Sequence, residues 1–396
     1  MANRSYDLYG ALDLRRYLAP EDFKTIFDLS NEKYNGKGWQ VCASFDQKQL
    51  SRVWANNVKD SQIIPKASTL GVGAKKPIRS TSGWKFYGGN IFKIGHATKL
   101  DEDDLLKLQE LAANDQNKMG RLIIDAFMTR SDELIIGMHN KLTSWVNKAK
   151  STGLVVDSDV DGISVGVDMN VPVSNKLTTK ASWFDKSQNY KPLETFNGNV
   201  VDPIENMLEA QKYADDNNIP YDHWEMTKKM FDMFVKHPAV IAKCRNRLTN
   251  VTNATYALVE ADVMSLVHGY GVAPIVIVDE KTAKEIDGIA QVDTDSFDTD
   301  ALVLCQSGDL FDIKNACSVY EERVKNGGQT AAAQYSFIGE NNAIAILNTW
   351  EERPIQNIFE SELWAFPVFK NPKNIVILHT QASHAWTLPE NVYVND

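Results

Sequence analysis

The chain is poor in cysteine and contains no long apolar run. Its 396 residues include four cysteines and no Cys-x-x-Cys pair. A disulfide framework or a cysteine-ligated zinc site is therefore not expected, and a reducing compartment is favoured. No segment reaches the about 18 apolar residues of a membrane-spanning helix, and no apolar signal-peptide core follows Met1. We expect neither a membrane segment nor a secretion signal. The cysteines are Cys42, Cys244, Cys305 and Cys317.

Familiar catalytic and nucleotide-binding motifs are absent as well. The patterns G-x-S-x-G, H-E-x-x-H and G-x-G-x-x-G do not occur. We therefore predict no enzymatic activity, no catalytic residues and no cofactor. Because catalytic groups can assemble from distant residues, a soluble α+β enzyme with an unrecognised site stays an alternative. The histidines are dispersed: His96, His139, His223, His237, His268, His379 and His384.

The bulk composition is that of a globular protein. Hydrophobic residues make up 43% and charged residues 24% of the chain, which is long enough for two or three lobes. The net charge of −10 argues against a surface that binds nucleic acid through its phosphates. Such a charge suits a protein that lies beside DNA without binding it.

Proline is absent from residues 119–149, where apolar residues recur every three, four or seven positions. This spacing predicts one face of an α-helix, which would be about 46 Å long. Ser151, Thr152 and Gly153 supply a stop. The alternative is two ordinary helices broken near Ser131. The apolar positions are Met119, Ile123, Phe127, Leu134, Met138, Leu142, Trp145 and Ala149.

Acidic residues are absent from residues 61–98, and residues 65–94 combine glycines with basic side chains. The phosphate-binding pattern G-x-x-x-x-G-K-[ST] is missing, so a nucleotide site is disfavoured. We instead predict a basic, extended loop, with strands at 68–72 and 84–94, that contacts an acidic neighbouring subunit. The candidate contact residues are Lys66, Lys75, Lys76, Arg79 and Lys85.

Residues 157–162 have the order D-x-D-x-D-G, which opens an EF-hand calcium loop. Asp157, Asp159 and Asp161 are therefore calcium candidates. An EF-hand loop continues into a helix, whereas residues 163–168 alternate as a strand does. A β-hairpin that turns at residues 161–162 explains the same sequence.

The remaining pattern predicts an α+β fold, because strands and helices do not alternate regularly. Residues 1–60 look too interrupted for a core of their own and are predicted to be an arm. A buried strand is expected at 274–279 and an acidic surface loop at 293–300. Helices are expected at 99–111, after Asp202 and Pro203, at 220–238 and at 255–267. Further strands are expected at 302–304, 344–347, 364–369 and 374–380.

Three groups of residues resemble tailed-bacteriophage major capsid proteins of the lambda-E-like group. The resemblance extends over roughly residues 65–380. The first group is Trp183-Phe184-Asp185 and Tyr190-Lys191-Pro192, followed by the helix that Asp202-Pro203-Ile204 opens. The second is the 220–238 segment that ends in His-Pro. The third is Trp350-Glu351-Glu352-Arg353-Pro354 with residues 362–367 and 374–378.

This resemblance implies the Hong Kong 97 type capsid fold. It assigns residues 1–60 to an N-terminal arm and 61–98 to an extended loop. Residues 99–199 become a peripheral domain with the 119–149 spine helix, and 200–340 an axial domain. Residues 341–396 become C-terminal strands that return to the peripheral domain.

The implied function is a virion shell subunit that self-assembles into hexamers and pentamers around double-stranded DNA. Its partners would be other copies, a portal, a separate scaffolding protein and a cement protein, with assembly in the host cytoplasm and no membrane. An encapsulin-type compartment shell is the alternative with the same fold. A shell subunit is expected to keep its core, but not to assemble, when residues 1–40 are removed.

Overall fold

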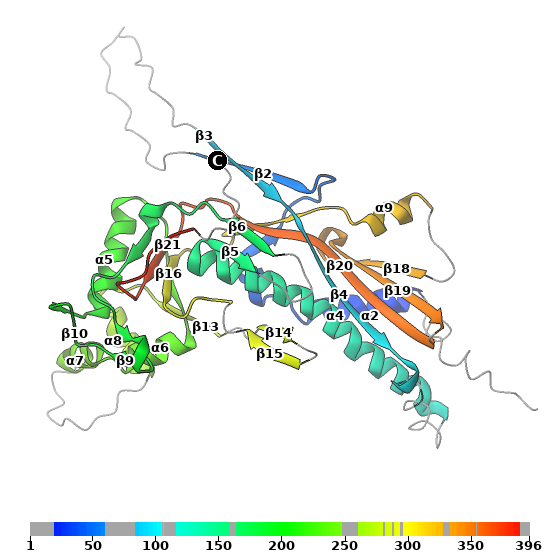
Figure 1. The fold of residues 1–396 in the computed structure, drawn as a ribbon, viewed down its shortest axis with the longest axis horizontal. Coiled ribbons are helices and arrows are strands. Elements are labelled where there is room, and N and C mark those ends of the chain that lie inside the picture. Colours follow the sequence, from blue (N-terminus) through cyan, green and yellow to red (C-terminus); the bar gives the residue numbers. More distant parts are fainter. Residues whose placement is uncertain are drawn as a thin grey trace, which may run out of the picture. The chain divides into compact units, whose positions relative to one another are not determined.

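The computed structural model describes residues 20–59, 84–104, 106, 116–157, 164–247, 260–279, 282–286, 289–293, 296–327, 333–353 and 355–388. The chain divides into two compact units (Figure 1). Unit 1 comprises Met1–Trp54, Gly89–Thr143 and Phe311–Val368. Unit 2 comprises Ala55–Gly88, Ser144–Leu310 and Phe369–Asp396.

Unit 1 is built on a six-stranded sheet in the order β1-β17-β20-β19-β18, with β4 paired along β20. β1 is parallel to β17, whereas β19 is antiparallel to both β18 and β20. Phe311, Phe359 and Leu363 are fully buried in it. The strands are β1 (Ala43–Phe45), β4 (Phe92–Leu100), β17 (Phe311–Asn315), β18 (Ala333–Ile338), β19 (Ile344–Glu352) and β20 (Ile355–Phe369).

The N-terminal helix α2 (Pro20–Glu32) lies against β18, and the short helix η2 (Gly38–Val41) leads into β1. Phe27, Tyr34 and Trp39 of this region are buried within unit 1. Residues 20–45 of the predicted arm therefore belong to the folded core of their own chain. The arm stays a prediction for residues 1–19, which lie outside the described residues. Helix α9 (Val319–Lys325) and η5 (Glu340–Asn342) also belong to this unit.

The helix predicted at 119–149 is confirmed as α4 (Gln116–Thr152), which contributes residues to both units. It is one continuous helix of about 55 Å, so a break near Ser131 is excluded. It ends at Gly153, which has φ +69° and donates its N–H to the carbonyl of Ala149 at 3.0 Å. The predicted apolar face is buried at Leu134, Met138, Leu142, Trp145 and Ala149.

Unit 2 has a five-stranded sheet in the order β13-β12-β16-β21-β7. β12 is parallel to β13 and antiparallel to β16, so its backbone is paired on both sides. Helices α5 to α8 supply side chains to a core with Trp183, Trp224 and Phe234. The elements are β7 (Lys176–Thr178), β12 (His223–Thr227), β13 (Ile275–Val278), β16 (Ala301–Cys305), β21 (Val376–His379), α5 (Pro203–Asp216), α6 (Lys228–Val235), α7 (Pro238–Arg247) and α8 (Glu260–His268).

Five two-stranded ribbons complete the described strands. Helices and mixed sheets that do not alternate regularly confirm the predicted α+β class. The ribbons are β2 (Val53–Lys59) with β3 (Trp84–Asn90), β5 (Leu154–Asp157) with β6 (Val165–Asp168), β8 (Phe184–Asp185) with β9 (Lys191–Pro192), β10 (Thr195–Phe196) with β11 (Asn199–Val200), and β14 (Thr282–Ile286) with β15 (Ile289–Asp293). The short helices η3 (Val173–Asn175) and η4 (Lys186–Gln188) lie between them in sequence.

The helix predicted at 220–238 is wrong in its first half. His223–Thr227 form the strand β12, and the helix begins only after Thr227, whose Oγ1 accepts the N–H of Met230 at 3.1 Å. The Met and aromatic spacing is typical of a helix, but the backbone of β12 pairs with strand β13 on one side and strand β16 on the other. Pairing with distant strands therefore overrides the local pattern.

Other predicted boundaries also change. The 84–94 strand is divided between β3 and β4 at Ile91, and Leu100 still belongs to β4, so the next helix begins at Glu102. Asp101 caps this helix by accepting the N–H of Asp104 at 3.1 Å. The strand at 274–279 exists as β13, but it lies at a sheet edge and Val276 is 46% exposed. Predicted residues 68–72 lie outside the described part of the chain.

Several local predictions are confirmed. Asp202 caps α5 by accepting the N–H of Glu205 at 3.2 Å, and Pro203 is its first residue. α8 (Glu260–His268) begins inside the predicted 255–267 range and ends one residue beyond it. The late strands appear as β16, β19, β20 and β21. Within the described residues, no helix has both the length and the hydrophobicity to span a bilayer. The five-segment domain scheme stays a prediction.

Candidate functional site

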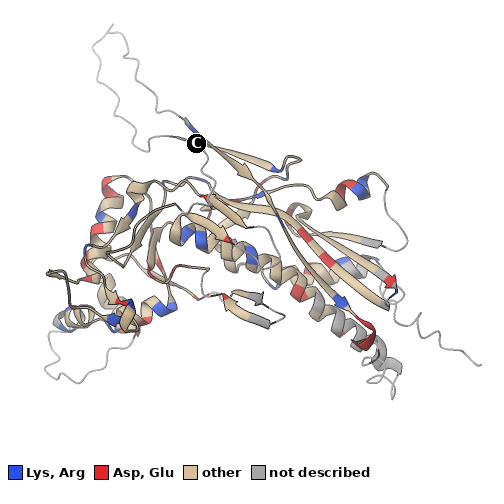
Figure 2. Ribbon diagram, in the orientation of Figure 1, with Lys and Arg blue, Asp and Glu red and all other residues tan. Residues whose placement is uncertain are grey.

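The predicted basic contact residues lie on the ribbon β2–β3 or next to it in sequence. Lys85 is on β3 and is exposed. Lys66, Lys75, Lys76 and Arg79 lie outside the described residues. Elsewhere, basic and acidic residues are interspersed, as along α5 and α9 (Figure 2). The intersubunit role of these five residues stays a prediction.

The calcium candidates are only partly described. Asp157 ends β5 and accepts hydrogen bonds from Trp145 Nε1 at 2.7 Å and Lys148 Nζ at 3.2 Å. Asp159 and Asp161 lie outside the described residues. β5 and β6 pair antiparallel, with Asp157 opposite Val165, as the hairpin interpretation predicts. Because protein donors already bind both oxygens of Asp157, the hairpin accounts for this residue without an ion.

Three of the described ribbons carry large apolar residues that are more than half exposed. Phe86 on β3 is 74% exposed, and Val53 on its partner strand β2 is 57% exposed. Val200 on β11 is 77% exposed, and Val292 on β15 is 61% exposed. A two-stranded ribbon alone is only marginally stable in water, and its exposed apolar side chains are available for contacts with another chain. These ribbons are the candidate assembly surface.

In unit 1, the segment after α2 is held against α4 by a buried histidine. His139 Nδ1 accepts the indole N–H of Trp39 at 3.1 Å, so its proton is on Nε2, which donates to Asn31 Oδ1 at 2.8 Å. The ring of Tyr34 stacks on His139 with centroids 4.5 Å apart. Burial lowers the pKa of His139 to about 4. The imidazole is therefore a neutral structural group at physiological pH.

One turn further along α4, Thr143 completes this contact. Its Oγ1 lies 2.5 Å from Tyr34 Oη and accepts the backbone N–H of Trp39 at 3.2 Å. Gly38 has φ +55°, and a Cβ there would lie 2.0 Å from Tyr34 Oη and 2.4 Å from Thr143 Oγ1. Only glycine fits this approach. We call the group formed by Asn31, Tyr34, Trp39, His139 and Thr143 the N-terminal clamp.

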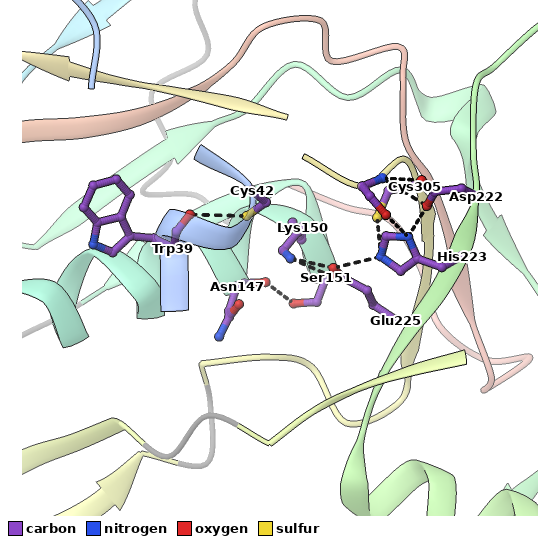
Figure 3. A network of polar contacts seen from close by, with 10 residues as sticks. Trp39, Cys42, Asn147, Lys150, Ser151, Asp222, His223, Glu225 and Cys305 are labelled. Atoms are coloured by element: carbon purple, nitrogen blue, oxygen red, sulfur yellow. Dashed lines mark hydrogen bonds and ion pairs between the residues drawn. The ribbon is translucent and has the colours of Figure 1, made fainter. Parts of the chain in front are cut away.

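In unit 2, strand pairing assembles a buried polar network (Figure 3). His223 lies opposite Cys305 in the β12–β16 register, and Glu225 follows two residues later on the same face of β12. His223 Nε2 lies 3.3 Å from Glu225 Oε1 and 3.7 Å from Cys305 Sγ. Lys150, in the last turn of α4, donates to Glu225 Oε1 at 2.9 Å and Oε2 at 2.7 Å. All four residues are buried.

The charges of this network are strongly coupled. Burial by itself raises the pKa of Glu225, but the Lys150 ammonium and His223 more than offset this and lower it to about 2. The hydrogen bond to Glu225 is the main cause that raises the pKa of His223, and burial opposes it. His223 Nδ1 is hydrogen-bonded to the Asp222 carboxylate, which also accepts the N–H of Ser307 at 2.9 and 3.0 Å.

Cys305, His223 and Asp222 are the three residue types of a cysteine–histidine–aspartate nucleophilic triad. Here the thiol is not available to a substrate, because Cys305 is only 1% exposed. Reactive cysteines are partly exposed, whereas buried ones are inert. The geometry therefore supports a structural or metal-binding role for the network and not acyl transfer.

A second titratable cluster in unit 2 contains Asp298, Asp300 and His379. His379 Nδ1 accepts the N–H of Gln381 at 3.2 Å, so Nε2 keeps its proton, directed at Asp298 Oδ2 at 3.6 Å. Burial raises the pKa of Asp298, but His379 and backbone donors lower it overall. Lys186 is paired with Asp300. Because His379 has no lone pair left toward the carboxylates, this cluster is a set of ion pairs and a poor metal site.

This cluster also corrects the prediction of an acidic surface loop at 293–300. Ser296, Phe297 and Asp300 are buried, and Asp298 donates its backbone N–H to Ser151 Oγ at 3.0 Å. The loop was assigned to the surface because of its charge. Asp300 is instead paired with Lys186, and Asp298 faces the Nε2–H of His379; both partners come from distant parts of the sequence.

Sequence analysis did not identify His223, Glu225 and Cys305 as a group. The available signal was His-x-Glu, which places both side chains on one face only if the segment is a strand. Because residues 220–238 were assigned to a helix, the two residues were placed on different faces. Cys305 could not be joined to them without the β12–β16 register.

No family model and no curated protein matches the chain. Solved structures do match it. A prophage protein of Escherichia coli CFT073 assigned as a capsid protein is 12% identical, with a TM-score of 0.45 over 96% of this chain and 99% of that one. The capsid of cyanophage A-1(L) is 12% identical, with a TM-score of 0.42 over 89% and 93%. An encapsulin of Synechococcus elongatus PCC 7942 is 11% identical, with a TM-score of 0.36 over 87% and 86%.

Phage capsid proteins, the family that the sequence resembles, are among these matches. An encapsulin, the alternative with the same fold, is also among them.

Proposed function

We propose that this chain is a phage major capsid protein that self-assembles into hexamers and pentamers of an icosahedral shell around double-stranded DNA. The observation that carries the proposal is the set of ribbons β2–β3, β10–β11 and β14–β15 with exposed apolar side chains. Their role would be to bury these side chains against neighbouring copies. The sequence resemblance supports the same interpretation. The work of the protein is then assembly and not catalysis.

The free energy that the ribbons contribute to assembly can be estimated from the apolar side chains that they bury. Fully burying a side chain such as Phe86 or Val292 contributes about 1.5–3 kcal/mol. A subunit with several such contacts is held in a closed ring by their sum, and each contact alone stays reversible. Reversibility allows misplaced subunits to leave a growing shell.

The proposal extends to the predicted segments and partners. Within the predicted 1–60 segment, residues 1–19 act as the arm, and residues 61–98 act as the extended loop with its basic residues toward acidic neighbours. Residues 99–199 and 341–396 form the peripheral domain, and 200–340 the axial domain. Portal, scaffolding and cement proteins are the proposed partners, the mature location is the virion, and assembly takes place in the host cytoplasm.

The first test is the assembly state of the purified chain by size-exclusion chromatography and negative-stain microscopy. We expect closed shells or five- and six-membered rings. Phe86→Ser and Val292→Ser are each expected to raise the assembly concentration about 10- to 100-fold, because each removes an apolar contact. Val319→Ser is the matched control, since Val319 is 51% exposed on α9 and outside the ribbons.

A monomer or dimer at all salt and protein concentrations, also when candidate scaffolding proteins are co-expressed, would overturn the proposal. Shells that are equally sensitive to Val319→Ser would remove the ribbons from it. Shells that load a protein cargo instead of incorporating a portal at one vertex would identify the encapsulin-type compartment.

The N-terminal clamp changes the expected outcome of the deletion. Removing residues 1–40 deletes Phe27, Tyr34 and Trp39 from unit 1, so we now expect loss of its cooperative thermal unfolding. Removing residues 1–19 leaves every described contact in place and is expected to leave the melting temperature unchanged while assembly is impaired. Circular dichroism melting and size-exclusion chromatography measure the two effects. Normal assembly after the 1–19 deletion would contradict the arm role.

A further inference from the structure

The buried network on β12 and β16 has the donor set of a transition-metal site. Three donor atoms of different chemistry converge there: His223 Nε2, Glu225 Oε1 and Cys305 Sγ, all within 4.8 Å of one another. The three residues are at most 8% exposed. Two of them face each other across the strand pair, and the third is two residues along the same strand. The sheet therefore holds all three in place.

Two of their three separations match the edges of a tetrahedron around zinc, and the third is within 4.8 Å. With Zn–N of about 2.0–2.1 Å, Zn–S of about 2.3 Å and Zn–O of about 2.0–2.2 Å, ideal edges are about 3.6 Å for N to S and about 3.4 Å for N to O. The observed distances from His223 Nε2 are 3.7 Å to Cys305 Sγ and 3.3 Å to Glu225 Oε1. No rearrangement of the strands is needed to bring these atoms to coordination distance.

The surroundings of His223 orient its ring as those of a metal ligand do. Its Nδ1 is hydrogen-bonded to the Asp222 carboxylate, which two hydrogen bonds from the Ser307 backbone N–H hold in place. Metal-bound histidines usually donate their second ring N–H to such a carboxylate, which fixes the tautomer. A metal ion would take the place of the Nε2 proton that bonds Glu225, and the proton kept on Nδ1 would leave the Nε2 lone pair directed at the ion.

We propose that His223, Glu225 and Cys305 bind a divalent transition-metal ion of the zinc class, with water as the fourth ligand. Thiolate, imidazole and carboxylate together suit Zn²⁺ and not Mg²⁺ or Ca²⁺, which prefer oxygen ligands alone. On binding, the Cys305 thiol releases its proton to solvent, and any proton on His223 Nε2 leaves as well. No electron transfer is involved.

The hydrogen bonds from Lys150 do not prevent Glu225 from binding the metal. Each carboxylate oxygen has two lone pairs, so Glu225 Oε1 can bind the metal and still accept from Lys150, which also binds Oε2. Lys150 thereby orients Glu225 in the way that Asp222 orients His223. The metal would join β12 to β16, in the middle of the unit 2 sheet, and so stabilise that sheet.

The test is titration of the chelator-treated full chain with Co²⁺, followed by Zn²⁺. We expect one Co²⁺ per chain with a thiolate-to-cobalt charge-transfer absorption, which Zn²⁺ abolishes. Cys305→Ser should remove this absorption and weaken binding by more than tenfold. Asp222→Asn, which removes the carboxylate that holds His223 but no proposed ligand, should weaken binding about 10- to 100-fold and keep the absorption. Zn²⁺ should raise the melting temperature of the unaltered chain but not of Cys305→Ser.

Cys317→Ser is the matched control, because Cys317 is a partly exposed cysteine outside the network. It should bind Co²⁺ as the unaltered chain does. The proposal is overturned if the folded chain takes up no Co²⁺ or Zn²⁺, if the absorption survives Cys305→Ser, or if Cys317→Ser abolishes it. Circular dichroism of each variant verifies folding, and the result is independent of whether the chain forms shells.

Discussion

Lys150→Met is expected to lower the free energy of unfolding by about 3–5 kcal/mol. Lys150 is 5% exposed and donates to both oxygens of Glu225, which is 7% exposed. Without the ammonium, Glu225 has to stay charged in a buried site or take up a proton. The charge is expensive to bury alone, and protonation forfeits the stabilisation that lowers its pKa to about 2. Urea unfolding followed by tryptophan fluorescence measures the loss.

The double variant Lys150→Met with Glu225→Leu separates the net contribution of the ion pair from the cost of leaving one buried charge unpaired. Replacing a buried ion pair by apolar residues of similar size is often neutral or stabilising, so the double variant should recover most of the loss. Lys228→Met is the matched control, because Lys228 pairs with Glu260 at 2.9 Å on the surface and should show little change. A double variant as unstable as Lys150→Met would show that packing, and not charge, determines the effect.

Lowering the pH from 7.5 to 4 is expected to remove about 3 kcal/mol of stability through His139 alone. Its pKa is about 4 in the folded protein and 6.5 ordinarily, a difference of 2.5 units at about 1.4 kcal/mol each. Between these values the unfolded chain binds a proton that the folded chain excludes, so stability falls as pH falls. The stabilisation is complete above about pH 6.5 and is lost toward pH 4.

Comparison with His139→Gln separates this effect from the effects of carboxylates and other histidines that titrate in the same pH range. The stability advantage of the unaltered chain over His139→Gln should shrink by about 3 kcal/mol between pH 7.5 and 4. His96→Gln is the control, since His96 is exposed on β4, and it should follow the unaltered chain at every pH. A constant difference between the unaltered chain and His139→Gln would show that His139 does not titrate in this way.

Features that depend on neighbours in sequence could be predicted well. The α4 helix follows from apolar residues every three or four positions, and its end follows from Gly153, which has φ +69°. The start of α5 follows from Asp202 and Pro203. In each case, the residues that form the hydrogen bonds lie within about four positions of one another, so the sequence contains the whole interaction.

Features that depend on pairing between distant residues could not be predicted. Residues 223–227 have a helical spacing but form β12, because β13 and β16 flank them. The acidic loop at 293–300 is partly buried because Lys186 pairs with Asp300 and His379 faces Asp298. The N-terminal clamp depends on contacts about 100 residues apart, such as that of Trp39 with His139.

The sequence by itself determined the α+β class, the long helix α4, the helix caps and the resemblance to phage capsid proteins. Only the tertiary structure decided that residues 20–45 belong to the core of unit 1, and that His223, Glu225 and Cys305 meet beside Lys150. The physical reason is that a helix satisfies its backbone locally, whereas a strand does so with partners whose register the sequence does not state. The donor atoms proposed to bind a metal meet at one such register.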